Sequence, residues 1–252
     1  MVRTAHVATI VCVSLCGLAP GNAGELQVAV ASNFVGTLHE LAQDFETTTD
    51  DRVLISSGSS GKLHAQITHG APFEIFLAAD GDSPALLEQD GQAVADTRFT
   101  YALGRLALWS PRPGTIDDGQ TVLHKGEFRH LAMANPRTAP YGAAALQVLE
   151  NLELWEEVES RVVLGENVAQ AFSFVSTGNA EIGLVAMAQI EGLDESRRGS
   201  FWVVPRELLS PIEQQAVLLA TGRDNPTAKR FMAYLRSPAA RTIIERAGYE
   251  VE

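Results

Sequence analysis

Residues 26–45 have the sequence LQVAVASNFVGTLHELAQDF, in which an apolar run leads through two polar residues into an amphipathic segment. The run 26–31 predicts a buried strand, because short apolar runs bounded by turn residues are typical of strands covered on both faces. Between residues 34 and 45, apolar side chains recur at helical spacing, which predicts a helix with one buried face. The residues on that face are Phe34, Leu38, Leu41, Ala42 and Phe45. A strand that leads directly into a helix is the repeating unit of α/β folds.

The same alternation continues to the end of the chain. Further strands are predicted at residues 52–56, 73–79, 105–109, 130–134, 161–164, 182–186, 201–204 and 216–220. Further helices are predicted at residues 63–67, 83–89, 142–152, 168–176, 227–235 and 239–247. This alternation predicts an α/β fold of mostly parallel sheets with helices on both faces. Ligands of such sheets bind at the carboxyl ends of the strands, where helices begin.

Length and charge narrow the class of protein. The chain has 252 residues, which is enough for one large α/β unit or for two lobes of roughly 100 residues each. Its formal net charge is −12. A chain this acidic is repelled by nucleic-acid phosphates and by anionic lipid surfaces, so we expect neither as a partner.

Residues 1–23 have the features of a secretory signal peptide. Arg3 is followed by a mostly apolar stretch, 5–18, which is shorter than the ~20 residues of a membrane-spanning helix. Small residues precede a predicted cleavage site after Ala23. Both cysteines, Cys12 and Cys16, lie in this segment, so the mature protein has no disulfide and no thiolate. A lipoprotein anchor on Cys16 is the alternative. We expect an exported protein that is not inserted in the membrane after cleavage.

Four predicted strand-to-helix junctions are rich in small, hydroxyl or amide residues: 31–34 (ASNF), 56–61 (SSGSSG), 139–143 (APYGA) and 165–168 (GENV). The first N–H groups of a helix lack intrahelical acceptors and carry about half a positive charge, so they bind anions without a cationic side chain. Serine and asparagine are also ordinary capping residues, and serine–glycine tracts are typical of flexible loops, so capping alone is the alternative at each junction. Four such junctions together predict a pocket lined by hydrogen-bond donors.

A tetrahedral dianion suits a pocket of this kind. When fully deprotonated it has only acceptors, which N–H and O–H donors satisfy and a carboxylate would repel. The overall acidity of the chain does not oppose this binding, because distant charges are screened over ~8 Å at physiological salt.

The junctions and the segments around them resemble periplasmic molybdate-binding proteins, the type II solute-binding partners of molybdate ABC importers. The resemblance covers nearly all of the mature chain. It is carried by 31–34, by 57–67 (SGSSGKLHAQI), by 70–80 (GAPFEIFLAAD), by 135–142 (NPRTAPYG) and by 183–185 (GLV). Each motif is loose by itself, but their order and spacing together are specific.

The resemblance implies a two-lobed type II periplasmic-binding-protein fold, in which each lobe has a mostly parallel or mixed sheet flanked by helices. Lobe I would contain residues 24–103 and 215–252, and lobe II residues 104–214. Two hinge segments would cross between the lobes, near 102–106 and 214–217.

The resemblance also implies the ligand-binding residues. Ser32 and Ser60 would each give a hydroxyl and an N–H donor, and Asn33 a further donor at the same helix start as Ser32. Tyr141 would give its N–H and its phenol, and Val168 its N–H. Some members take a tyrosine from the strand after Gly-Leu-Val, where this chain has Ala186, so this chain resembles the branch with its tyrosine in the other loop.

Function and partners follow from the same resemblance. The ligand would be molybdate or tungstate, with molybdenum present only inside the oxyanion and with no cofactor. The protein would be a periplasmic monomer that delivers its ligand to a membrane ABC permease complex, and it would not be an enzyme.

Three other functions remain alternatives. The first is binding of sulfate, phosphate or another small anion, for which an arginine such as Arg137 or a lysine such as Lys62 would serve as a clamp. The second is an exported hydrolase that uses a loop serine, although no base partner for such a serine is apparent. The third is a sensory module with the same fold and a different membrane partner.

Asp80 follows a predicted strand, and we assign it to a turn rather than to the binding site.

Overall fold

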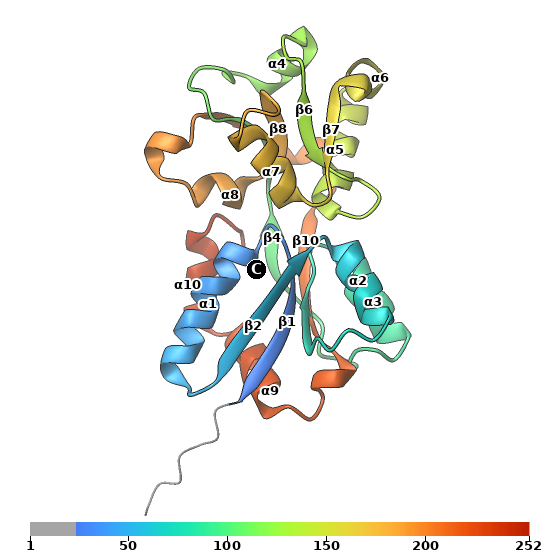
Figure 1. Cartoon of the computed structure of the whole chain (residues 1–252), viewed down its shortest axis with the longest axis vertical. Coiled ribbons are helices and arrows are strands. Elements are labelled where there is room, and N and C mark those ends of the chain that lie inside the picture. The colour runs from blue at the N-terminus through green and yellow to red at the C-terminus, as the bar shows by residue number, and fades with distance from the viewer. Residues whose placement is uncertain (1–23, 252) are drawn as a thin grey trace, which may run out of the picture.

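The computed structural model describes residues 24–251 and consists of two lobes stacked along the long axis (Figure 1). The predicted signal peptide, with its cleavage site at Ala23 and both cysteines, lies outside the described residues. Each lobe is built on one five-stranded sheet flanked by helices, which confirms the predicted α/β fold with two lobes. None of the helices in the described part of the chain is long and apolar enough to cross a membrane.

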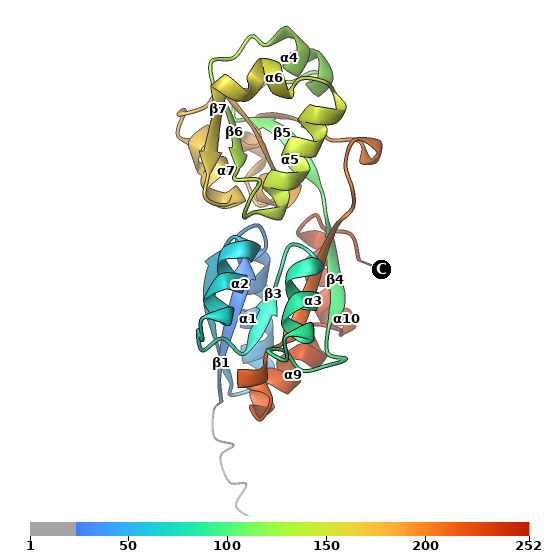
Figure 2. The same ribbon diagram turned by 90° about the vertical axis from the view of Figure 1, so that its right-hand side faces the viewer.

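The first lobe is built on a sheet of strand order β2-β1-β3-β10-β4. Its strands are β1 (Glu25–Ala31), β2 (Arg52–Gly58), β3 (Ile75–Leu77), β4 (Phe99–Gly104) and β10 (Ile212–Leu218). Strand β1 is parallel to β2 and to β3, whereas β10 is antiparallel to β3 and to β4. Strands β1, β2 and β3 therefore end at the same edge of the sheet, which faces the second lobe (Figures 1 and 2).

Helices cover both faces of this first sheet. They are α1 (Val35–Thr48), α2 (Ser60–Thr68), α3 (Asp82–Gln89), α9 (Pro226–Tyr234) and α10 (Pro238–Arg246), with the 3-10 helix η4 (Ala220–Gly222) before α9. Helices α1, α9 and α10 bury their apolar residues with Val28 and Val30 of β1. Helices α2 and α3 pack on the opposite face, against Ala29 and Phe76. Alternate residues of one strand thus contribute to two separate cores, as the strand period of two requires.

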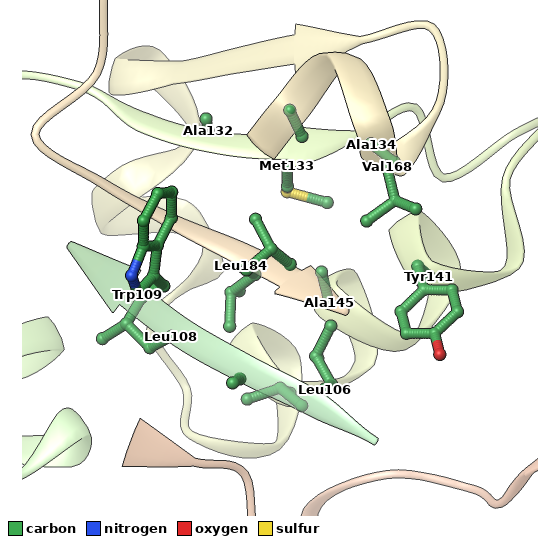
Figure 3. Close-up of a cluster of buried hydrophobic side chains, with 14 of the residues drawn as sticks. Leu106, Leu108, Trp109, Ala132, Met133, Ala134, Tyr141, Ala145, Val168 and Leu184 are labelled. Carbon is green, nitrogen blue, oxygen red and sulfur yellow. The ribbon is translucent and has the colours of Figure 1, made fainter. Parts of the chain in front are cut away.

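The second lobe has a sheet of strand order β7-β6-β8-β5-β9. Its strands are β5 (Leu106–Ser110), β6 (Leu131–Ala134), β7 (Val162–Gly165), β8 (Ile182–Ala186) and β9 (Ser200–Val203). Its helices are α4 (Gly119–Lys125), α5 (Pro140–Asn151), α6 (Trp155–Val158), α7 (Val168–Ser176) and α8 (Met187–Glu191), with 3-10 helices η1 (Glu159–Arg161), η2 (Glu195–Arg197) and η3 (Arg206–Leu208). The apolar side chains form one cluster (Figure 3), at whose edge Trp109 stacks on Phe172 with ring centroids 4.5 Å apart.

The chain passes between the two sheets twice. It leaves the first sheet at Gly104 and enters the second at Leu106, and it returns through residues 204–211. The second predicted crossing, 214–217, lies inside β10, which begins at Ile212 and pairs with β4 from its first residue. The predicted division into lobe I (24–103 and 215–252) and lobe II (104–214) stays a proposal about which segments move as units.

The sheets are mixed rather than wholly parallel. Strands β5 and β10 each follow a crossing, and each runs antiparallel to both of its neighbours. The parallel strands of each sheet end at the edge that faces the other lobe. A strand that enters from the other lobe begins at this edge, so it runs antiparallel to them. Strand β4, which pairs with β10 beside the crossings, and helix α4 were not predicted from the sequence.

Candidate functional site

A small cavity lies between the lobes, and all four predicted junctions line it. The space inside it that the centre of a water molecule can reach is about 10 Å³. The lining residues are Ala31, Ser32, Asn33, Gly58, Ser59, Ser60, Ala79, Ala139, Pro140, Tyr141, Asn167 and Val168. The five residues predicted to bind the ligand are therefore brought together from both lobes of the molecule. Among these lining residues none carries a charged side chain.

The start of α2 contributes two serines with different environments. Ser59 is the N-cap residue and has the extended backbone of a cap, but its side chain caps no N–H group. Its Oγ is buried and has no hydrogen-bond partner among the described residues. The Oγ of Ser60 accepts a hydrogen bond from the Ala79 N–H at 2.9 Å, and its hydroxyl donates to the buried Asp80 carboxyl, so its backbone N–H is the donor that remains. Sequence reasoning singled out Ser60 and missed Ser59, although the tandem serines of the loop were visible.

The turn after β1 contributes Ser32 and Asn33, both 6% exposed. The Ser32 N–H donates to the Gly58 carbonyl at 2.9 Å, so this residue has only its hydroxyl to offer. The Asn33 amide donates to Gln214 Oε1 at 2.7 Å and to Tyr249 Oη at 3.1 Å. Both amide hydrogens of Asn33 are thereby used inside the first lobe, and its backbone N–H is the donor that remains. The N–H of Ser32 is thus not a free donor, contrary to prediction, and the donor predicted for Asn33 can only be its backbone N–H.

Helix α5 begins at the cavity with Pro140 in its first turn. Its N-cap residue, Ala139, has no side chain able to cap, so the Tyr141 N–H has no acceptor among the described residues. The Tyr141 phenol lies at the edge of the second lobe's apolar cluster with its oxygen pointing away from it (Figure 3). Burial raises the pKa of Tyr141 well above its ordinary value of 10, so the phenol keeps its hydrogen at neutral pH.

Helix α7 begins at Val168, which is 3% exposed. Here the capping alternative applies, because the Asn167 side chain accepts a hydrogen bond from the Gln170 N–H at 3.1 Å. That cap leaves the Val168 N–H without an acceptor in the described part of the chain. The positive end of the α7 dipole adds to that of α5 at the same cavity.

Three contacts between the lobes surround the cavity. The Gly61 N–H donates to the Thr138 carbonyl at 3.0 Å, and the Ala169 N–H lies 3.4 Å from Ser32 Oγ. Lys62 and Glu166 form an ion pair at the rim, with 46% and 51% of their side chains exposed. The structure therefore has the closed form of the cleft, since each contact joins residues of opposite lobes.

The charged residues weighed in the sequence lie outside the cavity. Lys62 pairs with Glu166 and does not line the pocket. Arg137 is exposed. Asp80 accepts a hydrogen bond from the Ser83 N–H at 2.6 Å, as its assignment to a turn predicted. Burial raises the pKa of Asp80, while hydrogen bonds from Ser83 and Ser60 oppose that rise.

The chemistry of the cavity follows from these groups. It offers the hydroxyl hydrogens of Ser32 and Ser59 and backbone N–H groups at the starts of helices, and none of its lining residues is a carboxylate or a histidine. Within residues 24–251, no group of three or more His, Cys, Asp or Glu side chains is placed to hold a metal ion. Such a site is built to hold acceptor atoms of a small solute rather than to transfer a proton.

Known proteins share this fold and sequence. The model of the bacterial extracellular solute-binding proteins matches residues 26–250. The molybdate-binding protein ModA of Azotobacter vinelandii is 49% identical over 91% of this chain and 91% of that protein. ModA of Rhodobacter capsulatus is 44% identical, over 94% of this chain and 92% of its own length. A solved periplasmic molybdate-binding protein of Azotobacter vinelandii superposes with a TM-score of 0.87 at 43% identity, covering 90% of this chain and 99% of that one. The chain belongs to the bacterial extracellular solute-binding proteins, in the family of the molybdate-binding protein ModA.

Proposed function

We propose that this protein captures molybdate, and also tungstate, in the cleft between its lobes and delivers it to an ABC importer. The observation that carries the proposal is the small cavity lined by N–H and O–H donors from both lobes. The names of the relatives at 49% and 44% identity support molybdate as the ligand.

The donor set explains why a fully deprotonated dianion is favoured. Every oxygen of such an ion accepts hydrogen bonds, and the donors of Ser59, Ser60, Tyr141 and Val168 converge on one small space. An ion that keeps a proton, such as hydrogen phosphate, needs an acceptor for it, and no carboxylate lines this cavity. The buried helix starts supply the positive potential, which is stronger here than in water because the surroundings are less polarisable.

Binding across the cleft also provides the signal for transport. The ligand would contact Ser60 on one lobe and Val168 on the other, so it binds the closed form more tightly than the open form and shifts the equilibrium toward closure. We propose that a membrane permease complex recognises this closed form. The protein would act as a periplasmic monomer, after export and cleavage of residues 1–23, without a cofactor and without enzymatic activity.

Calorimetry tests the ligand directly. Residues 24–252 contain every described element of the fold and are titrated with molybdate, with tungstate, and with molybdate in the presence of millimolar sulfate. We expect one-to-one binding of molybdate and tungstate that survives the sulfate. Binding of sulfate alone would keep the mechanism and change the ligand. No heat with any of these anions from a folded sample would reject the proposed function.

A further inference from the structure

A buried polar cluster lies beside the cavity, where β10 emerges from the second crossing. At its centre is Gln214, whose side chain is fully buried. Its Oε1 accepts hydrogen bonds from the Asn33 amide at 2.7 Å and from the Tyr101 phenol at 3.3 Å. Because a carboxamide has its oxygen and its NH₂ group on opposite sides, these two bonds fix the direction in which Gln214 Nε2 points.

Gln214 Nε2 lies near the Tyr141 phenol. A Cβ atom placed on Gly104 would lie 3.0 Å from Gln214 Nε2 and 2.3 Å from Tyr141 Oη, so both atoms border the space that this glycine leaves open. Neither atom has a hydrogen-bond partner among the described residues, although both are buried. A buried polar atom without a partner costs about 1–3 kcal/mol, so a donor and an oxygen in this position are placed to pair.

The two residues belong to different lobes. Gln214 is on β10 of the first sheet, and Tyr141 is on α5 of the second lobe, so their separation depends on the angle between the lobes. The N–H group of Gln214 can donate to the phenol oxygen while the phenol hydrogen is donated elsewhere. Tyr141 lines the cavity, and burial keeps its phenol protonated.

We propose that Gln214 is a positioning residue of the anion site: when an oxyanion occupies the closed cleft, its Nε2 donates to the Tyr141 oxygen and thereby directs the phenol hydrogen toward the bound oxyanion. This inference rests on the proposed function, because it assigns a role within the same site. It gives a role to the buried NH₂ group of Gln214 in β10 and to the absence of a side chain at Gly104.

A double-mutant cycle tests the link between the two residues. Molybdate affinity is measured calorimetrically for the native chain, Gln214→Met, Tyr141→Phe and the double variant. If Gln214 acts through the phenol, Gln214→Met weakens binding at least about fivefold in the native background and less than about twofold when Phe replaces Tyr141. Tyr101→Phe removes a partner from the other side of Gln214, and its effect should be the same in both backgrounds.

Two results would overturn the inference. Equal weakening by Gln214→Met in both backgrounds would mean that Gln214 supports the site only through packing or through Asn33. A native chain that is folded and binds no molybdate would reject the proposed function, and this inference with it. If Gln214→Met does not fold, the uncharged variant Gln214→Leu replaces it in the same cycle, with the loss again expected to shrink in the Tyr141→Phe background.

Discussion

At the scale of single residues, the two adjacent serines at the start of α2 have different roles. One supports the fold, and the other is available only to a ligand. Ser60 Oγ holds the Ala79 N–H at 2.9 Å, so it supports the fold as well as the cavity. Ser59 Oγ lines the same cavity and is buried without a partner in the described part of the chain. An unsatisfied buried hydroxyl costs free energy in the empty protein, and a bound acceptor recovers it.

We therefore predict different outcomes for two alanine substitutions. Ser59→Ala should weaken molybdate binding by about 1–3 kcal/mol, which is roughly 5- to 150-fold, while leaving the melting temperature of the ligand-free protein equal or higher. Ser60→Ala should lower that melting temperature, because the Ala79 N–H loses its acceptor. Calorimetry and thermal unfolding of both variants provide the measurements. A Ser59→Ala protein with native affinity would remove this serine from the binding site.

At the scale of elements, the alternation of strands and helices was predictable, because the spacing of apolar residues and the length of each apolar run are local features of the sequence. Strand β1 and helix α1 begin and end within a few residues of the predicted limits. The beginning of β10 was not predictable, because Glu213, Gln214 and Gln215 interrupt the apolar pattern. The acceptor of Gln214 is satisfied by Asn33 and Tyr101, which are 181 and 113 positions away in the sequence.

The same limit applies to the candidate site. The four junctions were predictable, since small and hydroxyl residues at helix starts are a local signal. Which atom of each junction faces the cavity was not predictable. Asn33 and Asn167 are both asparagines beside a helix start, but one has its amide bound to Gln214 and the other caps α7. Only the three-dimensional neighbours decide between these roles.

The buried carboxylate of Asp51 links helix α9 to the start of β1 through hydrogen bonds. Asp51, 6% exposed, accepts hydrogen bonds from the Gly24 N–H at 3.0 Å, from Thr227 Oγ1 at 3.1 Å and from two nitrogens of Arg230 at 2.9 and 2.6 Å. Burial acts to raise the pKa of Asp51, but these hydrogen bonds outweigh it and lower the pKa below its ordinary value. The ionised carboxylate thus stabilises the folded state.

Asp51→Ala should lower the free energy of unfolding by about 2–3 kcal/mol at pH 7, because it leaves buried donors and Arg230 without their partner. The pKa of Asp51 is lower in the folded than in the unfolded protein, so its stabilisation is complete above the unfolded value of about 3.9 and is lost as the pH falls through the folded value. The difference between the native and variant proteins should accordingly shrink in that acid range. Urea unfolding from pH 7 to pH 3 measures it.

The ion pair of Glu40 and Arg246 supplies the control for that experiment. Both side chains are largely exposed, at 53% and 68%, so Glu40→Ala should change stability by less than about 0.5 kcal/mol. A loss from Asp51→Ala no larger than this would contradict the structural role assigned to the buried carboxylate.

At the scale of the whole molecule, closure depends on how near the two lobes approach. The exposed ion pair between Lys62 and Glu166 contributes at most about 1 kcal/mol, and salt screens it. The closer approach is at Gly61, whose backbone meets that of Thr138 in the other lobe at 3.0 Å. A Cβ atom at Gly61 would lie 2.9 Å from the Thr138 oxygen and 3.3 Å from its Cα, so any larger residue separates the lobes.

Gly61→Ala should therefore hold the cleft partly open. We expect molybdate affinity to fall by about 1–3 kcal/mol, or roughly 5- to 150-fold, since closure must now displace backbone atoms. The radius of gyration of the molybdate-saturated protein, measured by small-angle scattering, should exceed that of the native complex. The melting temperature without ligand should not fall, because alanine is a better helix residue than glycine.

Gly36→Ala is the matched control: Gly36 is likewise the second residue of a first-lobe helix, α1, and its Cβ would meet nothing within 4 Å. If both variants bind and close alike, contact at Gly61 does not limit closure, and the orientation of the lobes must be set at the crossings instead.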